Sequence, residues 1–345
     1  MSKSLFENHD YFSWDALEDR EVFQTKTWDR KKPLIVFDEL HKKPQFKAWL
    51  KGIFDKEGVR PRLLVTGSAR LDIAKKMGDS LAGRFYAYRL HPLDLWELGT
   101  SGAVEKNYER LLECSGFPEP FFAKKHIYKK WATTHLDLIL RQDLLDLESV
   151  RSISKIETLL ALLQTRVAST VSYSSLARDL EVDGKTVKKW LEILENLFIV
   201  FRVSPFHKNI ARSIMKEPKY YFYDVARVRG DEGQKLENLV ALALKKRLDY
   251  LHDHVGFKAQ LHFVRTKDGA EIDFYIHPEE SAGHLIEVKL SDGARSPHFD
   301  RFVRQLRPAS SVQIVKNLTR EKTFPDGLEV RAALPWLRDM PILNL

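Results

Sequence analysis

The residues best suited to chemistry lie in the last third of the chain. Residues 263–276 have the pattern of a β-hairpin around a Lys-Asp-Gly turn, and residues 284–289 have that of a further strand. Asp273 lies in the second arm of the hairpin. Because alternate side chains of a strand share a face, Glu287 and Lys289 should lie side by side. Such carboxylates can hold Mg²⁺, and a lysine beside them can stabilise negative charge.

This arrangement resembles the PD-(D/E)xK nuclease fold. That fold adds an acid from a helix, and Glu237, at the start of a helix predicted over 234–248, fits this position. The resemblance implies that Asp273 and Glu287 hold one or two Mg²⁺, with Glu237 completing the shell through water. Lys289 would position the attacking water or stabilise the phosphorane charge. The alternative is that Glu287 and Lys289 only pair with each other on an exposed face of an inactive fold.

The middle of the chain has the pattern of a DNA-binding motif. Residues 151–215 carry ten Lys and Arg against six Asp and Glu. Two short helices predicted from Ser174 and from Thr186 are separated by a glycine-containing turn, which is the helix-turn-helix pattern. The apolar stretches Leu197–Val203 and Tyr220–Tyr223 then predict a strand pair. Together these elements predict a winged helix.

Three lysines stand where such a motif would meet DNA. Lys185, Lys188 and Lys189 lie at the start of the second short helix, the part that faces the major groove in helix-turn-helix proteins. The sequence therefore predicts contacts from these lysines to DNA phosphates. The alternative is that the winged helix only packs domains together.

The first half of the chain has the pattern of a parallel sheet. Continuous apolar runs occupy 34–37 and 63–65, and an amphipathic stretch at 46–54 lies between them. Strand, helix and strand form the unit of a parallel sheet, which binds ligands at the carboxyl ends of its strands. Asp38 and Glu39 follow the first run directly. They therefore stand at a predicted ligand site.

These segments resemble the AAA-type P-loop ATPases, in particular a two-part prokaryotic family with a poorly characterised C-terminal domain. The first strand and its two acids are similar to the Walker B segment, so Asp38 would bind Mg²⁺ and Glu39 would polarise the attacking water. The second strand is similar to the sensor strand, which would place Ser68 near the γ-phosphate of ATP. Arg84, in a Ser-Leu-Ala-Gly-Arg segment, would contact phosphate in cis or from a neighbouring subunit.

The sequence departs from this family before the Walker B strand. A Walker A motif, Gly-x4-Gly-Lys-Ser/Thr, should precede that strand, but no glycine occurs before Gly52. Gly184-Lys185-Thr186 resembles the end of such a motif, but the residues before it predict a helix rather than a strand. Without the loop, ATP hydrolysis is not expected of the chain as written. A truncated reading frame and a degenerate ATPase are both compatible with this, and the missing strand should leave a gap or force two others together.

Composition narrows the class of protein. No run of about eighteen apolar residues and no signal-peptide pattern occur, so a cytoplasmic protein without a membrane span is expected. The net charge of +8 favours acidic partners such as nucleic acid. The single cysteine, Cys114, excludes an internal disulfide framework and an all-cysteine zinc site.

The length of 345 residues predicts more than one hydrophobic core, and the patterns divide the chain into four parts of an α/β protein. The parts are an incomplete parallel-sheet AAA core (1–102), a helical subdomain (103–150), a winged helix (151–224) and a small mixed α/β nuclease-like domain (225–345). The leading interpretation is an AAA-family ATP-binding protein, impaired in hydrolysis, with nucleic-acid-linked C-terminal domains. A Mg²⁺-dependent endonuclease and a non-catalytic module that binds DNA or protein are the alternatives. Self-association is also compatible with the sequence.

Overall fold

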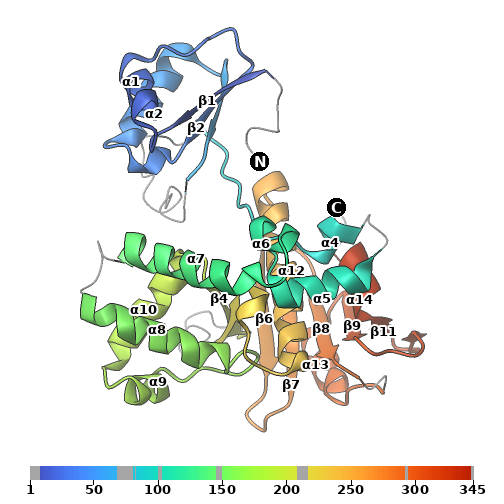
Figure 1. The fold of residues 1–345 in the computed structure, drawn as a ribbon. Coiled ribbons are helices and arrows are strands. Elements are labelled where there is room, and N and C mark those ends of the chain that lie inside the picture. Colours follow the sequence, from blue (N-terminus) through green and yellow to red (C-terminus); the bar gives the residue numbers. More distant parts are fainter. Residues whose placement is uncertain are drawn as a thin grey trace. The chain divides into compact units, whose positions relative to one another are not determined.

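The protein is described by a computed structural model, drawn as a ribbon in Figure 1. The described residues are 8–67, 81, 83–99, 103–144, 150–207, 217–291 and 294–342. Their contacts divide the chain into two compact units, Met1–Ala87 and Tyr88–Leu345, and each is described by itself. The fold is mixed α/β, as predicted, with a parallel sheet in the first unit and a helical region followed by a mixed sheet in the second.

The first unit is built on a three-stranded parallel sheet in the order β1-β2-β3. Its strands are β1 (His9–Ser13), β2 (Leu34–Asp38) and β3 (Arg62–Val65), and its helices are α1 (Leu17–Thr25), the 3-10 helix η2 (Leu40–Lys42) and α2 (Phe46–Glu57). The predicted strand-helix-strand unit is confirmed, and the four apolar residues of the central strand β2 are all buried. The three described strands are adjacent, with no gap between them.

Aromatic rings pack between this sheet and its helices. The ring of Phe37 in β2 contacts those of Trp28 and Trp49, with centroids 5.2 Å apart in each pair. The indole Nε1 of Trp49 also donates to the backbone oxygen of Phe23 at 2.9 Å. Edge-to-face aromatic pairs add about 0.5–1.5 kcal/mol beyond the burial of their area. The cluster therefore holds α2 against β2 and fixes the carboxyl end of β2, where Asp38 lies.

The second unit begins with a largely helical region, as predicted. Its helices are α4 (Leu95–Leu98), α5 (Val104–Cys114), α6 (Pro118–Phe122), α7 (Ile127–Leu144), α8 (Val150–Gln164), α9 (Tyr173–Asp179) and α10 (Gly184–Asn196). The two short helices predicted from residues 174 and 186 are α9 and α10, which pack against each other across a turn. Among the described helices, none combines the length and apolar character that crossing a bilayer requires.

An eight-stranded mixed sheet follows, in the order β10-β11-β9-β8-β7-β6-β4-β5 (Figure 1). Its strands are β4 (Val200–Pro205), β5 (Lys219–Phe222), β6 (Ala259–Arg265), β7 (Glu271–Pro278), β8 (His284–Lys289), β9 (Ser310–Val315), β10 (Lys322–Thr323) and β11 (Leu328–Ala332). The other elements are the 3-10 helix η4 (Val225–Arg227) and the helices α12 (Glu232–Val255), α13 (His298–Leu306) and α14 (Ala333–Asp339).

Two local predictions are confirmed in this sheet. The predicted hairpin is the antiparallel pair β6 and β7, and Gly269 takes a φ of +92° in its turn, where a side chain would be strained. The strand pair predicted after the short helices is the antiparallel pair β4 and β5. It does not stand apart, because β4 also pairs in parallel with β6. The region of α9 and α10 therefore continues directly into the large sheet.

Helix α12 is longer at both ends than the predicted 234–248. Asp231 and Gln234 form a capping box at its start, and Gly256 ends it with a φ of +73°. No proline or glycine interrupts the helix after Gly233, so the helix runs on to Val255. It packs on β5, β6 and β8. This places Glu237, in its second turn, against the sheet.

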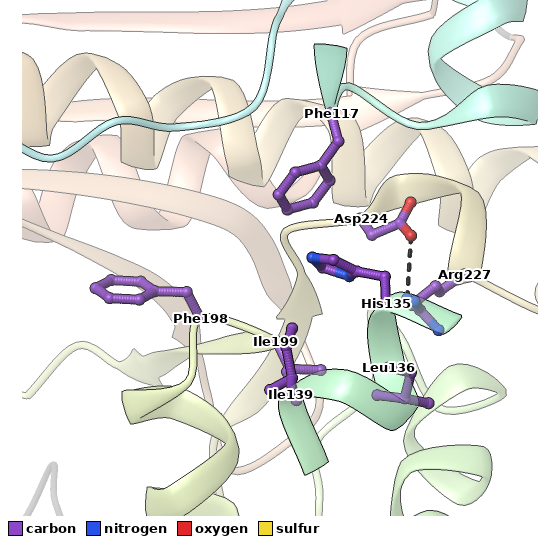
Figure 2. Close-up of a pocket in the computed structure, with 8 residues that line it drawn as sticks. All are labelled: Phe117, His135, Leu136, Ile139, Phe198, Ile199, Asp224 and Arg227. Atoms are coloured by element: carbon purple, nitrogen blue, oxygen red, sulfur yellow. Dashed lines mark ion pairs between the residues drawn. The ribbon is translucent and has the colours of Figure 1, made fainter. Parts of the chain in front are cut away.

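A buried polar network ties α7 to the segment after β5. Arg227 pairs with Asp224 at 3.0 Å and donates to the backbone oxygen of Ala132 at 2.7 Å, and Tyr128 donates to Asp224 at 3.0 Å. Figure 2 shows this ion pair beside His135, at a cavity of about 20 Å³. Such a space holds about one water, so it is no substrate pocket. Burial, with the nearby Arg227 charge, lowers the pKa of His135 to about 4.

Candidate functional site

The structure gathers the predicted acids of the second unit into one cluster. Asp273 on β7 and Glu287 on β8 come from neighbouring antiparallel strands, and the backbone N–H of Val288 donates to Asp273 Oδ2 at 2.8 Å. Lys289 Nζ lies 2.7 Å from Glu287 Oε1, which confirms that these two side chains share a face. Glu237 reaches the cluster from α12. The residues predicted from local spacing thus meet in three dimensions.

The alternative interpretation placed Glu287 on an exposed face of the fold. In the structure Glu287 is buried. Its side chain is 3% exposed, whereas that of Lys289 is 42% exposed. The pair therefore runs from the interior to the surface of the protein. This geometry leaves the lysine ammonium accessible to a bound group and keeps the carboxylate fixed beneath it.

A lysine that the sequence reading did not single out lies at the centre of the cluster. Lys219 begins β5, and its side chain is 1% exposed. Its Nζ lies 3.2 Å from Glu237 Oε1, 2.7 Å from Glu271 Oε1 and 3.9 Å from Asp273 Oδ1. Glu271 was also missed, although strand alternation from Asp273 pointed to it. For Lys219 the only sequence signal was its place at the head of the aromatic run Tyr220–Tyr223.

Helix α12 is held in register with β5 by two neighbouring side chains. Asn238, which is fully buried, accepts from the backbone N–H of Phe222 at 2.8 Å and donates to its oxygen at 2.9 Å. The hydroxyl of Tyr221 donates to Glu237 Oε1 at 2.7 Å. Since β5 ends the sheet, Asn238 also satisfies backbone groups that have no strand partner. These bonds fix Glu237 opposite Lys219.

The electrostatics of the cluster follow from its burial. Desolvation, with the charge of Asp273, raises the pKa of both Glu237 and Glu287, and desolvation raises that of Asp273. Burial alone would lower the pKa of Lys219, but attraction to its three acids raises it, so the ammonium stays charged. Four buried or half-buried carboxylates thus face two lysines. The cluster carries an excess of acid and favours a further cation or protons.

The donor set fits one divalent cation. Glu287 Oε2 is buried without a hydrogen-bond partner, which is costly for a carboxylate oxygen and is relieved by a cation. Asp273 and Glu287 supply the one or two carboxylates that Mg²⁺ usually takes when waters and substrate phosphates complete its shell. No group of three or more His, Cys, Asp or Glu suited to a metal occurs in the part of the chain that the structure describes. A site made wholly of protein ligands is therefore not indicated.

The predicted DNA-contacting lysines lie on α10. Asp183 caps this helix and accepts from the backbone N–H groups of Lys185 at 2.8 Å and Thr186 at 2.9 Å. An open groove of about 1000 Å³ lies between α9 and α10, and both Lys185 and Lys189 line it. Lys188 lies 3.9 Å from Glu192, and both side chains are more than half exposed. The start of α10 is thus basic and open to solvent.

The predicted ATPase residues of the first unit are held by neighbouring side chains. Asp38 accepts hydrogen bonds from the hydroxyls of Tyr11, in the middle of β1, and Thr66, which follows β3. Glu39 pairs with Lys42 at 3.2 Å. Arg84 Nε lies 3.0 Å from Asp55 on α2. Ser68 lies outside the described residues.

Three family models match successive parts of the chain. Residues 1–99 match an AAA domain, residues 105–229 match a domain of unknown function (DUF8612), and residues 232–335 match another (DUF4143). Helices α9 and α10 and Lys219 fall in the second match, and the four acids of the cluster fall in the third. Neither of the two C-terminal models carries a described activity.

Relatives with similar sequences are themselves uncharacterized. A Mycobacterium tuberculosis protein is 27% identical over 250 residues, which cover 70% of this chain and 56% of the relative. A Haemophilus influenzae protein is 21% identical over 360 residues, covering 96% and 86%, and a Methanocaldococcus jannaschii protein is 24% identical over 281 residues, covering 74% and 60%. The chain thus spans little more than half the length of the mycobacterial relative. Together the matches support an AAA-like family with C-terminal domains of unknown function.

Proposed function

We propose that the second unit of this AAA-like chain is a Mg²⁺-dependent nuclease. The observation that carries the proposal is the cluster in which Asp273, Glu287 and Lys289 meet at the carboxyl end of β8, with an unsatisfied carboxylate oxygen among them. Two carboxylates and a half-exposed lysine are suited to a phosphodiester and a divalent cation. The partly exposed site also gives a nucleic-acid backbone access to these groups.

Asp273 and Glu287 would hold the cation, which when bound would make its water more acidic and polarise a phosphate oxygen. The Val288 N–H orients Asp273, because it donates to one of its oxygens. Lys289 is half-exposed and reaches outward from Glu287, so it can donate to a phosphate oxygen and stabilise its charge. Glu237 contacts Lys219 and Tyr221.

The proposal is tested by cleavage of single- and double-stranded DNA and RNA with Mg²⁺ or Mn²⁺. Asp273→Asn and Glu287→Gln should each lower the cleavage rate at least 100-fold, and Lys289→Met should lower it about 10²–10⁴-fold. Glu279→Gln is the matched control, since Glu279 is exposed and pairs with the exposed Lys258 at 3.8 Å. Cleavage that survives unchanged in Asp273→Asn and Glu287→Gln excludes this site.

We further propose that the start of α10 binds the DNA backbone. The support is the placement of Lys185 and Lys189 along one open groove, with Lys188 exposed on the same helix turn. This gives the nuclease site a means of holding its substrate at some distance from the cut. The salt dependence of DNA binding tests it, because phosphate contacts release counterions.

We propose that the first unit descends from a nucleotide-binding domain and that ATP hydrolysis by this chain is impaired. The two carboxylates of the Walker B-like segment are engaged by side chains of the same unit, Asp38 by Tyr11 and Thr66 and Glu39 by Lys42. Within the 345 residues, no glycine-rich loop precedes Asp38 to hold phosphates. Nucleotide turnover by the purified chain, with a Mg²⁺-ATP substrate, is the direct test.

A further inference from the structure

The ammonium of Lys219 occupies a position that would suit a metal cation. Its ammonium is surrounded by carboxylates from two elements, Glu237 of α12 and both Glu271 and Asp273 of β7. It also lies 5.3 Å from the centre of the Phe263 ring, which favours a positive charge. An ammonium has three N–H donors, and here three carboxylates lie within 4.0 Å of it. The side chain is 1% exposed, so water does not replace these partners.

Lys219 already offsets part of the negative charge of the acids around it. A buried lysine is stable only where acids compensate its charge, and removing it would leave those acids unpaired in a poorly solvated space. Glu237 Oε1 also accepts a hydrogen bond from the hydroxyl of Tyr221. This oxygen therefore already has two partners within the protein, Lys219 and Tyr221. On this side of the cluster, a divalent cation would have to displace the ammonium. That leaves no place for a metal between Glu237 and Glu271.

The other side of the cluster is unsatisfied. Glu287 Oε2 is buried without a hydrogen-bond partner among the described residues, and Lys289 Nζ lies 2.7 Å from Glu287 Oε1. Asp273 lies between the two sides, 3.9 Å from Lys219 Nζ and bonded through its other oxygen to Val288. The cluster therefore has one side that Lys219 partly compensates and another side where a carboxylate oxygen of Glu287 has no hydrogen-bond partner among the described residues.

We propose that Lys219 is a built-in cation of this site, so that the site takes a single divalent cation, at Asp273 and Glu287. The inference rests on the proposed nuclease function and adds the number of metals and the roles of two acids. Glu237 and Glu271 position Lys219 and are not metal ligands. Lys219 in turn positions Asp273, because it is the fixed charge next to the oxygen that Val288 does not bind.

Mn²⁺ binding to the full chain tests this, by calorimetry and by the electron-spin signal of free Mn²⁺. The wild type should bind one ion, and Glu287→Gln should bind none. Glu237→Gln and Glu271→Gln should each keep one ion, since an amide oxygen can still accept from Lys219. Lys219→Met should bind two ions, because it removes the ammonium that lies between Glu237, Glu271 and Asp273.

Each outcome separates the two proposals. Two ions bound by the wild type, or loss of the ion in Glu237→Gln, overturns the role of Lys219 and leaves the nuclease proposal standing. No ion bound by the wild type at millimolar Mn²⁺ overturns the nuclease proposal itself, and the single-cation inference with it. Should Lys219→Met not fold, Glu237→Gln and Glu271→Gln alone decide whether those acids are ligands.

Discussion

The ammonium of Lys219 lies 3.2 Å from the carboxylate of Glu237 and so joins the edge strand β5 to α12 inside the protein. The two residues are 18 apart in sequence, and α12 brings the acid back over the strand. Asn238, next to Glu237, bonds both backbone groups of Phe222 in that strand. The acid cluster is thus part of the attachment of α12 to the sheet as well as a candidate for chemistry.

Removal of this lysine should destabilise the second unit. Lys219→Met leaves buried carboxylates without their cation, and breaking a buried pair in this way costs about 3–5 kcal/mol. The free energy of unfolding, from urea denaturation followed by circular dichroism, measures the loss. Lys258→Met is the matched control, because Lys258 and Glu279 form an exposed pair at 3.8 Å worth at most about 1 kcal/mol. Equal losses in the two variants would contradict a structural role for Lys219.

Acid should weaken the packing of α7. The pKa of His135 in the folded protein is lowered to about 4, below its ordinary value of 6.5, by burial and then by Arg227. The unfolded chain therefore binds the proton more readily, so this contribution to stability is complete above about pH 6.5 and is lost as the pH falls towards 4. In His135→Phe, which keeps a ring beside Phe117 and Trp131, that loss should disappear.

The measurement is the melting temperature of both proteins at pH 7 and at pH 4.5. The difference between the wild type and His135→Phe should shift in favour of the variant at the lower pH. A difference that is the same at both values would mean that His135 is not held neutral by its surroundings.

Neutralising the start of α10 should change how DNA binding depends on salt. If Lys185, Lys188 and Lys189 each contact a phosphate, replacing all three by Ala should lower the slope of log K against log salt by about three. Fluorescence anisotropy with a labelled duplex at several salt concentrations gives the slope. A triple replacement at exposed lysines near α7 serves as the control: Lys124, Lys129 and Lys130. An unchanged slope in the α10 variant would favour a packing role for this helix.

ATP should have little effect on the thermal stability of the chain. A ligand at a hundred times its Kd would stabilise the protein by about 2.7 kcal/mol, which is readily measured as a shift in Tm. We expect no shift specific to Mg²⁺-ATP, since Asp38 and Glu39 are engaged by their neighbours. Mg²⁺ alone and ADP are the controls. A clear ATP-specific shift would show that the first unit still binds nucleotide.

Local patterns were enough to predict many elements of the fold. The strand His284–Lys289, the hairpin before it and the strand pair β4 and β5 were all predicted, because alternation, turn residues and apolar runs act over a few neighbouring residues. The same alternation placed Glu287 and Lys289 on one face. The helix limits were less accurate, since α12 continues until Gly256 supplies a left-handed end.

The centre of the candidate site could not be predicted in this way. Lys219 and Glu271 gain their roles only when β4 pairs with β6 and α12 packs on β5, which are contacts between distant parts of the chain. None of the three acids around Lys219 is its neighbour in the sequence, so no local pattern indicates that this lysine is buried at the start of an aromatic strand. It is stable there because tertiary packing brings three carboxylates to its ammonium, and the charge balance of a buried group depends on all the elements that enclose it.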